Sequence, residues 1–414
     1  MSTRTLVEMD RRKFLRGALT ASSIAIAMRS MPLSSPLRAL ASSIPTVPGI
    51  ESQRQFAPVK VDRNRIIREV VGLRPYRPSG FVVSAERVDR KLIVHNYGHG
   101  GAGVTLSWGT ASLALDLARD FVIATTASST GPRRRIAKQR SRRFAVLGCG
   151  VSGLSTAILL QRRFQEGPGT VTIYAKDLPP ETTSNVSGAF WYPTSVYDLQ
   201  QATAQFTGQY LKACQISQKA FQLLVGADYG VRWIEALELM QNEASLTREL
   251  LGGASLYPQV EVHRDPNRYF GFPFARQFTT LMIEPHIYLS ALLRDFYVAG
   301  GRLVVKEFRS RDEIARLAEP VIFNCTGLGA RELFEDEELI PVRGQLEVLL
   351  PQPEIDYCYM SGLGYMFPRR DGIILGGTWD HENWSLNPNP EQTNQILAGH
   401  TEIMNGLKSA GPRN

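Results

Sequence analysis

The hydrophobic pattern is clearest between residues 144 and 174. Residues 144–147 form a short apolar run that predicts a buried strand, and 171–174 form a second run of the same kind. Between them, apolar residues recur at helical spacing over 154–163, which predicts a helix. A strand, a helix and a strand within about 30 residues are typical of a βαβ unit with parallel strands.

Three glycines stand where the first strand turns into the helix, as G-x-G-x-x-G. Gly148 permits a tight turn, Gly150 lets the backbone approach a pyrophosphate, and Gly153 lets the helix pack on the strand. Val151 and Ser152 belong to the first turn, whose free N–H groups and helix dipole attract anions. We therefore predict a dinucleotide site here; the alternative is a glycine-rich turn in another kind of α/β protein.

The end of the second strand departs from the dinucleotide-binding pattern. An acidic residue normally stands there and binds a ribose hydroxyl. In this chain Ala175 is followed by Lys176, and Asp177 comes one position later. Either Asp177 takes the role with a shift of one residue, or the ribose is held by other groups.

A second glycine-rich stretch, HNYGHGGAGVT at 95–105, precedes a helical pattern at 110–121. A glycine-rich loop before a helix N-terminus binds anions. Together with the first glycine turn, it suits one extended cofactor with negative charge at two places, a pyrophosphate and the N1–C2=O edge of a reduced flavin. His95 and His99 are not brought together by their spacing in a non-helical stretch, so we predict no metal site.

Strand and helix patterns alternate along the rest of the chain, which predicts an α/β fold. The predicted strands are 81–84 paired with 91–94, then 302–305, 321–323, 345–350, and a hairpin of 365–368 with 372–375; the predicted helices are 203–225, 284–300 and 391–407.

Composition limits the classes of function. At 414 residues the chain is long enough for two domains, and 43% hydrophobic with 21% charged residues is ordinary for a globular protein. The net charge of +8 comes from basic residues in 1–41 and 133–143, and the remainder is mildly acidic, so we expect no nucleic-acid partner. The four cysteines are far apart in sequence and form no metal motif or disulfide framework.

The N-terminal residues have the pattern of an export signal. DRRKFLR at 10–16 resembles a twin-arginine signal, an apolar stretch follows, and Ala39-Leu40-Ala41 offers a cleavage site. We expect residues 1–41 to engage the twin-arginine export machinery and the protein to reach the periplasm or the extracellular space. The alternative is a basic amphipathic tail. Residues 42–60 are predicted to be a flexible lead-in, and 122–142 a basic linker.

Several motifs occur together in this chain, and the set resembles the D-amino-acid oxidase family of FAD enzymes. The motifs are GLRPYRP at 72–78, HNYGHGGAGVT at 95–105, the glycine turn at 148–153, TTS at 182–184, NCTG at 324–327, RGQ at 343–345, LGGT at 375–378 and NW at 383–384. The resemblance implies FAD as cofactor. It also implies an α/β (α+β) two-domain fold, with a Rossmann-type FAD domain and a substrate domain built on a mixed or antiparallel sheet.

The order of these motifs differs from the family's order. The first two strings end the family's chain, after its final helix, but here they precede the first strand at 144. We therefore expect a circular permutation, because a break in a surface connection leaves the contacts of a fold unchanged. This predicts that 404–410 lie close to 60–67.

The resemblance divides the chain as follows. Residues 61–121 complete both domains, 143–200 form the FAD-binding βαβ unit, 201–320 the substrate or cap domain with returns to the FAD domain, 321–345 a further FAD-binding segment, and 346–410 the substrate-domain strands and final helix.

The resemblance also assigns roles to residues. Arg74 would bind the substrate α-carboxylate, Tyr365 would support the same carboxylate, and the Gly101 carbonyl would accept from the amine. Thr105 and the Gly103 and Val104 amides would lie at the flavin N1–C2=O edge. The other implied FAD contacts are Gly100, Ala102, Gly148, Gly150, Val151, Ser152, Gly153, Ala175, Lys176, Asp177, Thr182, Thr183, Ser184, Gly188, Ala189, Phe190, Thr326 and Gly327.

Two positions depart from the family's pattern. Ser361 stands where a second active-site tyrosine is expected, which alters the loop over the substrate, and Tyr192 replaces a glutamine. The preferred D-amino acid is therefore left open.

The implied reaction is oxidative deamination of a D-amino acid, by hydride transfer from Cα to flavin N5, giving a 2-oxo acid and ammonia. Oxygen would reoxidise the flavin and yield hydrogen peroxide. One alternative is an amine or amino-acid dehydrogenase that passes electrons to a quinone or carrier, and another is a non-catalytic flavin-binding paralogue. The sequence does not set the oligomeric state, and a homodimer is compatible with it.

Overall fold

The computed structural model describes residues 56–127, 143–164, 170–188, 190–264 and 270–409. The predicted export signal at 1–41 and most of the predicted linker at 122–142 lie outside these ranges. Within the described residues the strands form two sheets, one of six strands and one of nine. None of the helices in these ranges is both long enough and apolar enough to cross a membrane.

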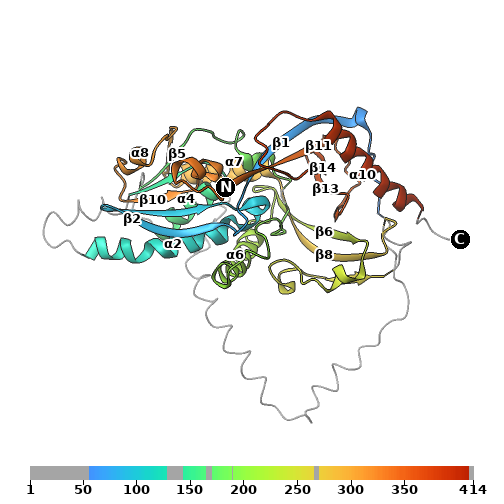
Figure 1. The fold of residues 1–414 in the computed structure, drawn as a ribbon, viewed down its shortest axis with the longest axis horizontal. Helices are drawn as coiled ribbons and strands as arrows, with labels where there is room; N and C mark the ends of the chain where they lie inside the picture. Colours follow the sequence, from blue (N-terminus) through green and yellow to red (C-terminus); the bar gives the residue numbers. More distant parts are fainter. Residues whose placement is uncertain (1–55, 128–142, 165–169, 189, 265–269, 410–414) are drawn as a thin grey trace, which may run out of the picture. The chain divides into compact units, whose positions relative to one another are not determined.

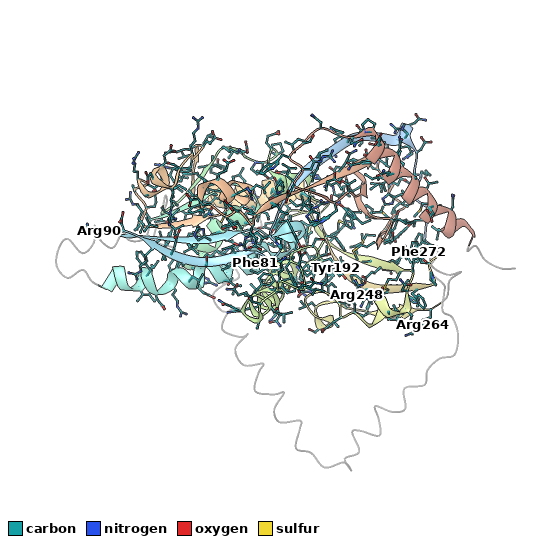
Figure 2. The ribbon with its side chains drawn as sticks, viewed as in Figure 1. Phe81, Arg90, Tyr192, Arg248, Arg264 and Phe272 are labelled. Carbon is teal, nitrogen blue, oxygen red and sulfur yellow. The ribbon has the colours of Figure 1, made fainter. Side chains whose placement is uncertain are left out.

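The six-stranded sheet contains the predicted βαβ unit. Its strands lie in the order β2 (Val82–Val88), β3 (Lys91–Tyr97), β10 (Val321–Asn324), β4 (Phe144–Leu147), β5 (Val171–Ala175) and β9 (Arg302–Val305). Five of these strands run parallel, and β2 pairs antiparallel with β3 at one edge, in a hairpin whose outer end carries Arg90 (Figure 2). Helix α4 (Val151–Arg163) connects β4 and β5, which confirms the predicted unit.

Strand β4 is buried along its whole length, as expected for a central strand of a parallel sheet covered on both faces.

Helix α2 (Gly103–Ala127) is longer than the sequence predicts. It begins at Gly103 rather than at 110, and it continues into the segment that we predicted to be a linker. The reason is burial, because Leu106 and Trp108 in its first turns are enclosed by the core. It packs on β2, β3, α4 and α6 (Ala204–Gln222), as Figure 1 shows for β2. Gly109 makes the contact with α6 close, since a Cβ there would stand 2.1 Å from the Ala213 carbonyl oxygen.

The nine-stranded sheet is mixed. Its strands lie in the order β1 (Ile66–Tyr76), β11 (Ile340–Leu349), β14 (Gly372–Gly376), β13 (Gly364–Arg369), β12 (Tyr357–Ser361), β6 (Val231–Met240), β8 (Phe274–Ile283) and β7 (Glu261–His263), and β15 (Asp380–His381) also pairs with β11. The β13–β14 hairpin was predicted, whereas β6, β8 and β12 were not. Strands β6 and β12 pair in parallel, and the other pairs are antiparallel.

The remaining helices are short or close to their predicted bounds. They are α5 (Thr183–Val186), α7 (Pro285–Val298), α8 (Arg311–Ala315), α9 (Ala330–Leu333) and α10 (Pro390–Ser409), with 3-10 turns at Arg63–Arg65, Gly100–Ala102, Glu243–Thr247, Ala254–Leu256 and Gly327–Gly329. The ends of α6, α7 and α10 differ from prediction by one to three residues.

The first described residues pack against the last helix. The Val59 N–H donates to Met404 Sδ at 3.1 Å, and Val61, Ile66 and Leu407 belong to the same apolar cluster. Figure 1 shows α10 beside β11 and β14. The predicted proximity of 404–410 to 60–67 is therefore observed for the described part of the helix, which ends at 409.

The flexible lead-in predicted for 42–60 is wrong for residues 56–60. Phe56 packs edge-on against Tyr357 with ring centroids 4.9 Å apart, and Val59 is only 3% exposed. These apolar side chains belong to the core, so burial orders a segment whose composition suggested disorder.

Candidate active site

A single cavity of about 910 Å³ takes residues from both sheets. Its walls come from the β4–α4 turn, the end of β5, the segment that precedes α2, the facing residues of β1, β11 and β13, and the segment that follows β14. Most of the predicted site residues line it. The exceptions are Gly153 and Ala102, which lie behind its wall, and Ala189, which is outside the described residues.

The β4–α4 turn has the close backbone contacts that its glycines predict. Gly148 has φ +102°, and a Cβ there would stand 2.4 Å from the Cys325 carbonyl oxygen. A Cβ on Gly153 would stand 2.0 Å from the Gly148 carbonyl oxygen, so this glycine lets the helix pack on the strand. The Val151 N–H donates to Ser184 Oγ at 3.0 Å, which joins the helix N-terminus to α5.

A second helix N-terminus faces the same cavity. The 3-10 turn Gly100–Ala102 leads directly into α2, so Gly103, Val104 and Thr105 lie in its first turn. Thr105 Oγ1 donates to the Phe190 carbonyl at 3.3 Å, and the Gly101 N–H donates to the Ser195 carbonyl at 2.9 Å. The cavity is therefore bordered by the positive ends of two helices, α2 and α4.

The two histidines of this stretch have structural partners. His99 Nε2 lies 3.1 Å from both Asn96 Oδ1 and Thr110 Oγ1, and burial lowers the pKa of His99 to about 4. His95 lies between Glu86, at 3.2 Å, and the Asn324 amide, at 3.1 Å. They point to different partners, as their non-helical spacing predicts.

Arg74 reaches into the cavity from β1. Its Nη1 donates to the Thr378 carbonyl at 3.2 Å, and its Nη2 lies 3.5 Å from Tyr365 Oη. The guanidinium carbon is 5.0 Å from the centre of the Trp379 ring. Among the described residues no carboxylate pairs with Arg74, in contrast to the ion pairs of Arg77 and Arg343. The cavity therefore holds a cation whose charge is free to bind an anionic ligand.

Glycines make the room for the Tyr365 ring. A Cβ on Gly376 would stand 2.1 Å from the Tyr365 ring, and one on Gly377 would stand 2.6 Å from Tyr365 Oη. On its other side the ring stacks on Phe367, with centroids 5.0 Å apart. The Gly-Gly pair at the end of β14 thus fixes the tyrosine hydroxyl beside Arg74.

The two departures from the expected pattern also line the cavity. Ser361 ends β12, where its Oγ accepts from the Leu363 N–H and donates to the Gly364 carbonyl, both at 3.1 Å, in a tight hairpin turn. Tyr192 stacks between Phe190 and Phe278, and burial raises its pKa above the usual range. Both residues thus contribute uncharged side chains to the cavity wall.

Residues 143–412 match the DAO family, described as FAD dependent oxidoreductase. The chain belongs to this family. It is 34% identical over 279 residues to a D-amino-acid oxidase of Rubrobacter xylanophilus, which covers 65% of this chain and 79% of the relative. It is 29% identical over 274 residues to a D-amino acid oxidase of Dugesia ryukyuensis (64% and 78%), and 30% identical over 265 residues to a D-aspartate oxidase of Homo sapiens (62% and 74%).

The residues of this DAO-family chain fit FAD. A side chain at Gly148 would collide with the backbone that follows β10. The glycine therefore leaves exposed backbone at this side of the cavity, which a ligand can approach closely. Two helix N-termini suit the two anionic parts of a flavin dinucleotide, the pyrophosphate and the reduced ring. At the end of β5, Lys176 and Asp177 both line the cavity, as do Lys306 and Arg309. Asp177 is therefore available to bind the ribose of the cofactor, and so are the other polar groups of this wall.

Several residues that line the cavity were not predicted as site residues, and those nearest Arg74 follow β14. Thr378, Trp379 and Trp384 line the cavity after β14, and the Trp379 indole N–H donates to His381 Nε2 at 2.8 Å. Thr378 and Trp384 belong to motifs that the sequence singled out without a role. Two tryptophans within a short polar segment were the signal that was available.

Proposed function

We propose that this FAD enzyme oxidises D-amino acids to imino acids, which hydrolyse to 2-oxo acids and ammonia, with oxygen as the final electron acceptor. The observation that carries the proposal is Arg74, a guanidinium in the cofactor cavity that lacks a carboxylate partner among the described residues and lies beside the Tyr365 hydroxyl. The relatives named D-amino-acid oxidase and D-aspartate oxidase support this class of substrate.

Arg74 and Tyr365 would bind and orient the substrate carboxylate. A guanidinium matches a carboxylate with two parallel hydrogen bonds, which fixes direction as well as position. The Tyr365 hydroxyl, 3.5 Å from Arg74 Nη2, stands where it can donate to the same carboxylate. The Gly101 carbonyl is the proposed acceptor for the amine. Holding both substrate groups aims the Cα–H bond in one direction.

Bound FAD supplies the hydride acceptor for this oxidation. The chain's contribution at that end is electrostatic. The Gly103 and Val104 amides in the first turn of α2, with the Thr105 hydroxyl, would hold negative charge at the flavin N1–C2=O edge.

The test uses the FAD-loaded protein without oxygen. We expect D-alanine to bleach the yellow flavin and L-alanine to leave it unchanged. Admitting air should then restore the colour rapidly. Slow return in air would favour a dehydrogenase that uses a quinone or carrier, and a flavin that no member of a D-amino-acid panel bleaches would favour a non-catalytic flavoprotein.

We further propose that the chain is a circular permutation of the family's order. The family match begins at residue 143, and the aligned segments account for 74–79% of the three relatives' length. Arg74 and the 95–105 stretch precede that segment and yet line the same cavity. The contact between Val59 and Met404 places the two ends of the fold together, as a permutation requires.

A reordered gene tests the permutation. Residues 143–409 would come first, joined by a short Gly/Ser linker to residues 56–127. We expect this chain to bind FAD and to oxidise D-alanine as the natural order does. A reordered chain that expresses but cannot bind FAD would contradict the proposal.

We also propose that residues 1–41 direct twin-arginine export. The support is the DRRKFLR string with the Ala39-Leu40-Ala41 site. Replacing Arg11 and Arg12 together by lysine should retain the protein in the cytoplasm of a bacterial host, measured by fractionation. Unchanged export in that variant would contradict the proposal.

A further inference from the structure

We propose that Arg343 is a positioning residue that fixes Arg74 and the segment after β14 for carboxylate binding. The inference rests on the proposed function, since it takes Arg74 as the carboxylate-binding group. Arg343 belongs to the RGQ motif, whose role the reaction itself does not explain. Its side chain is 2% exposed and does not line the cavity.

Strand β11 separates two sets of side chains. Gly344 and Leu346 line the cavity, whereas Gln345 bonds to Thr393 of α10 at 2.9 Å, on the opposite face. Residues alternate between the faces of a strand, so Arg343 points away from the cavity with Gln345. Arg343 therefore reaches the site only through the chain that it holds.

All three nitrogens of the Arg343 guanidinium are engaged. Nε donates to the Ser385 carbonyl at 3.0 Å, and Nη2 donates to the Asn387 carbonyl at 2.6 Å and to Gln345 Oε1 at 3.1 Å. Nη1 pairs with Asp380 Oδ2 at 3.2 Å and also bonds to Gln392 Oε1. Five donors in a rigid plane are thus matched to five acceptors, a set that a lysine cannot reproduce.

The segment held in this way touches the substrate-binding arginine. Thr378 accepts from Arg74 through its carbonyl at 3.2 Å, and its Oγ1 accepts from the Gln345 N–H at 3.0 Å. Trp379 follows and stacks on the Arg74 guanidinium. The next residue, Asp380, pairs with Arg343, and the following loop presents Trp384 to the cavity. Arg343 therefore anchors both sides of the cavity wall that contacts Arg74.

The test compares Arg343→Lys with Arg276→Lys in the FAD-loaded enzyme. Arg276 is a matched control because its side chain is 6% exposed, pairs with Glu238 at 2.7 Å and lies on β8 of the same sheet. The measurements are the kcat and KM for D-alanine, the Kd for benzoate as a simple carboxylate probe, read from the flavin absorbance, and the Kd for FAD.

We expect Arg343→Lys to raise the benzoate Kd and the D-alanine KM by about tenfold or more. The variant loses charge-assisted hydrogen bonds to the segment after β14, so this segment no longer holds Arg74 in place for the carboxylate. Its FAD Kd should stay within about threefold of wild type, and Arg276→Lys should leave all binding constants near wild type. A benzoate Kd for Arg343→Lys equal to that of wild type would overturn the inference, even if the variant melts at a lower temperature.

Failure of the proposed function would look different. A wild-type protein that binds FAD but neither binds benzoate nor oxidises D-alanine would remove Arg74 from carboxylate binding, and the positioning role would be overturned with it. If Arg343→Lys does not fold, Asp380→Asn takes its place, because it removes one charge and keeps an acceptor oxygen. We then expect a rise in benzoate Kd of about three- to tenfold, and an unchanged Kd would overturn the inference.

Discussion

The guanidinium of Arg74 lies against the backbone of Gly344, so that a Cβ on this glycine would stand 2.2 Å from Arg74 Nη1. The two residues lie on neighbouring strands, β1 and β11, two positions out of register, since Gly344 pairs with Gly72 and Arg74 pairs with Val342. The Arg74 guanidinium thus packs directly on the backbone of Gly344. Any side chain at this position must displace the group that we propose binds the substrate carboxylate.

Gly344→Ala should therefore weaken substrate binding without touching the substrate. We expect the KM for D-alanine to rise by about tenfold or more, since the guanidinium must move or rotate by more than the tolerance of a bidentate pair. Gly362→Ala is the control, because a Cβ there would meet nothing within 4 Å. Steady-state kinetics of both variants give the answer, and an unchanged KM in Gly344→Ala would contradict the placement of Arg74.

Arg74→Ala should leave FAD bound and nearly abolish turnover. Losing one partner of a charge-assisted pair costs about 3–5 kcal/mol, which corresponds to a fall in kcat/KM of roughly 10²–10⁴-fold. Arg68→Ala, on the same strand but half exposed and paired with Asp371, should stay near wild type. Normal activity in Arg74→Ala, measured by oxygen uptake, would remove this residue from the site.

Gly148→Ala should impair the cofactor rather than the substrate. An alanine at φ +102° is strained by about 1–3 kcal/mol, and its Cβ would also collide with the Cys325 carbonyl. We expect the FAD Kd, measured by fluorescence quenching, to rise by about tenfold or more. Gly208→Ala in α6, where a Cβ meets nothing within 4 Å, should bind FAD normally. Equal FAD affinity in the two variants would argue against the glycine turn as the cofactor cradle.

Stability should fall as the pH is lowered from about 6.5 to 4. Burial lowers the pKa of both His99 and His400 from 6.5 to about 4, so in this range the unfolded chain binds protons that the native chain does not. Each histidine contributes about 3 kcal/mol of this loss. His400 has little room to be charged, because its Nε2 donates to the Gly376 carbonyl while its Nδ1 accepts from Tyr359.

Urea unfolding at pH 7 and pH 4.5 measures this loss. In His400→Gln the loss between the two pH values should shrink by about 2–3 kcal/mol, because one of the buried histidines with a lowered pKa is gone. A His400→Gln profile parallel to wild type would show that this histidine is not the source.

The sequence predicted the parts whose signal is local. Strand β4 is a short apolar run, and the glycines after it have a backbone reason for each position, so the unit with α4 and β5 was placed within a few residues. Strands β6 and β8 were missed because VRWIEALELM and FARQFTTLMI do not alternate cleanly. Their burial is set by neighbours on both faces, and that information is not contained in either strand's own sequence.

The candidate site shows the same division. Motif residues such as Arg74 and Tyr365 could be named from the sequence, and the structure brings them to within 3.5 Å. Trp379 was missed because its place depends on how the segment after β14 turns back on β11. Phe56 and Val59 were assigned to a flexible lead-in because their partners, on α10 and β12, are some 300 residues away.

Strand β11 alone separates the cavity on one face from the contacts of α10 on the other. The number of residues in this strand is therefore constrained. On the cavity face, Gly344 must lack a side chain so that Arg74 can pack on it. On the opposite face, the Arg343 guanidinium must reach its hydrogen-bond acceptors, such as the Ser385 carbonyl. Inserting or deleting one residue in this strand would exchange the two sides, because side chains alternate along it. The Arg343 side chain would then enter the cavity as a second cation. The glycine that makes room for Arg74 would move to the face that packs on α10. Evolution can therefore lengthen the loops around this strand, but the strand itself can change only by substitution.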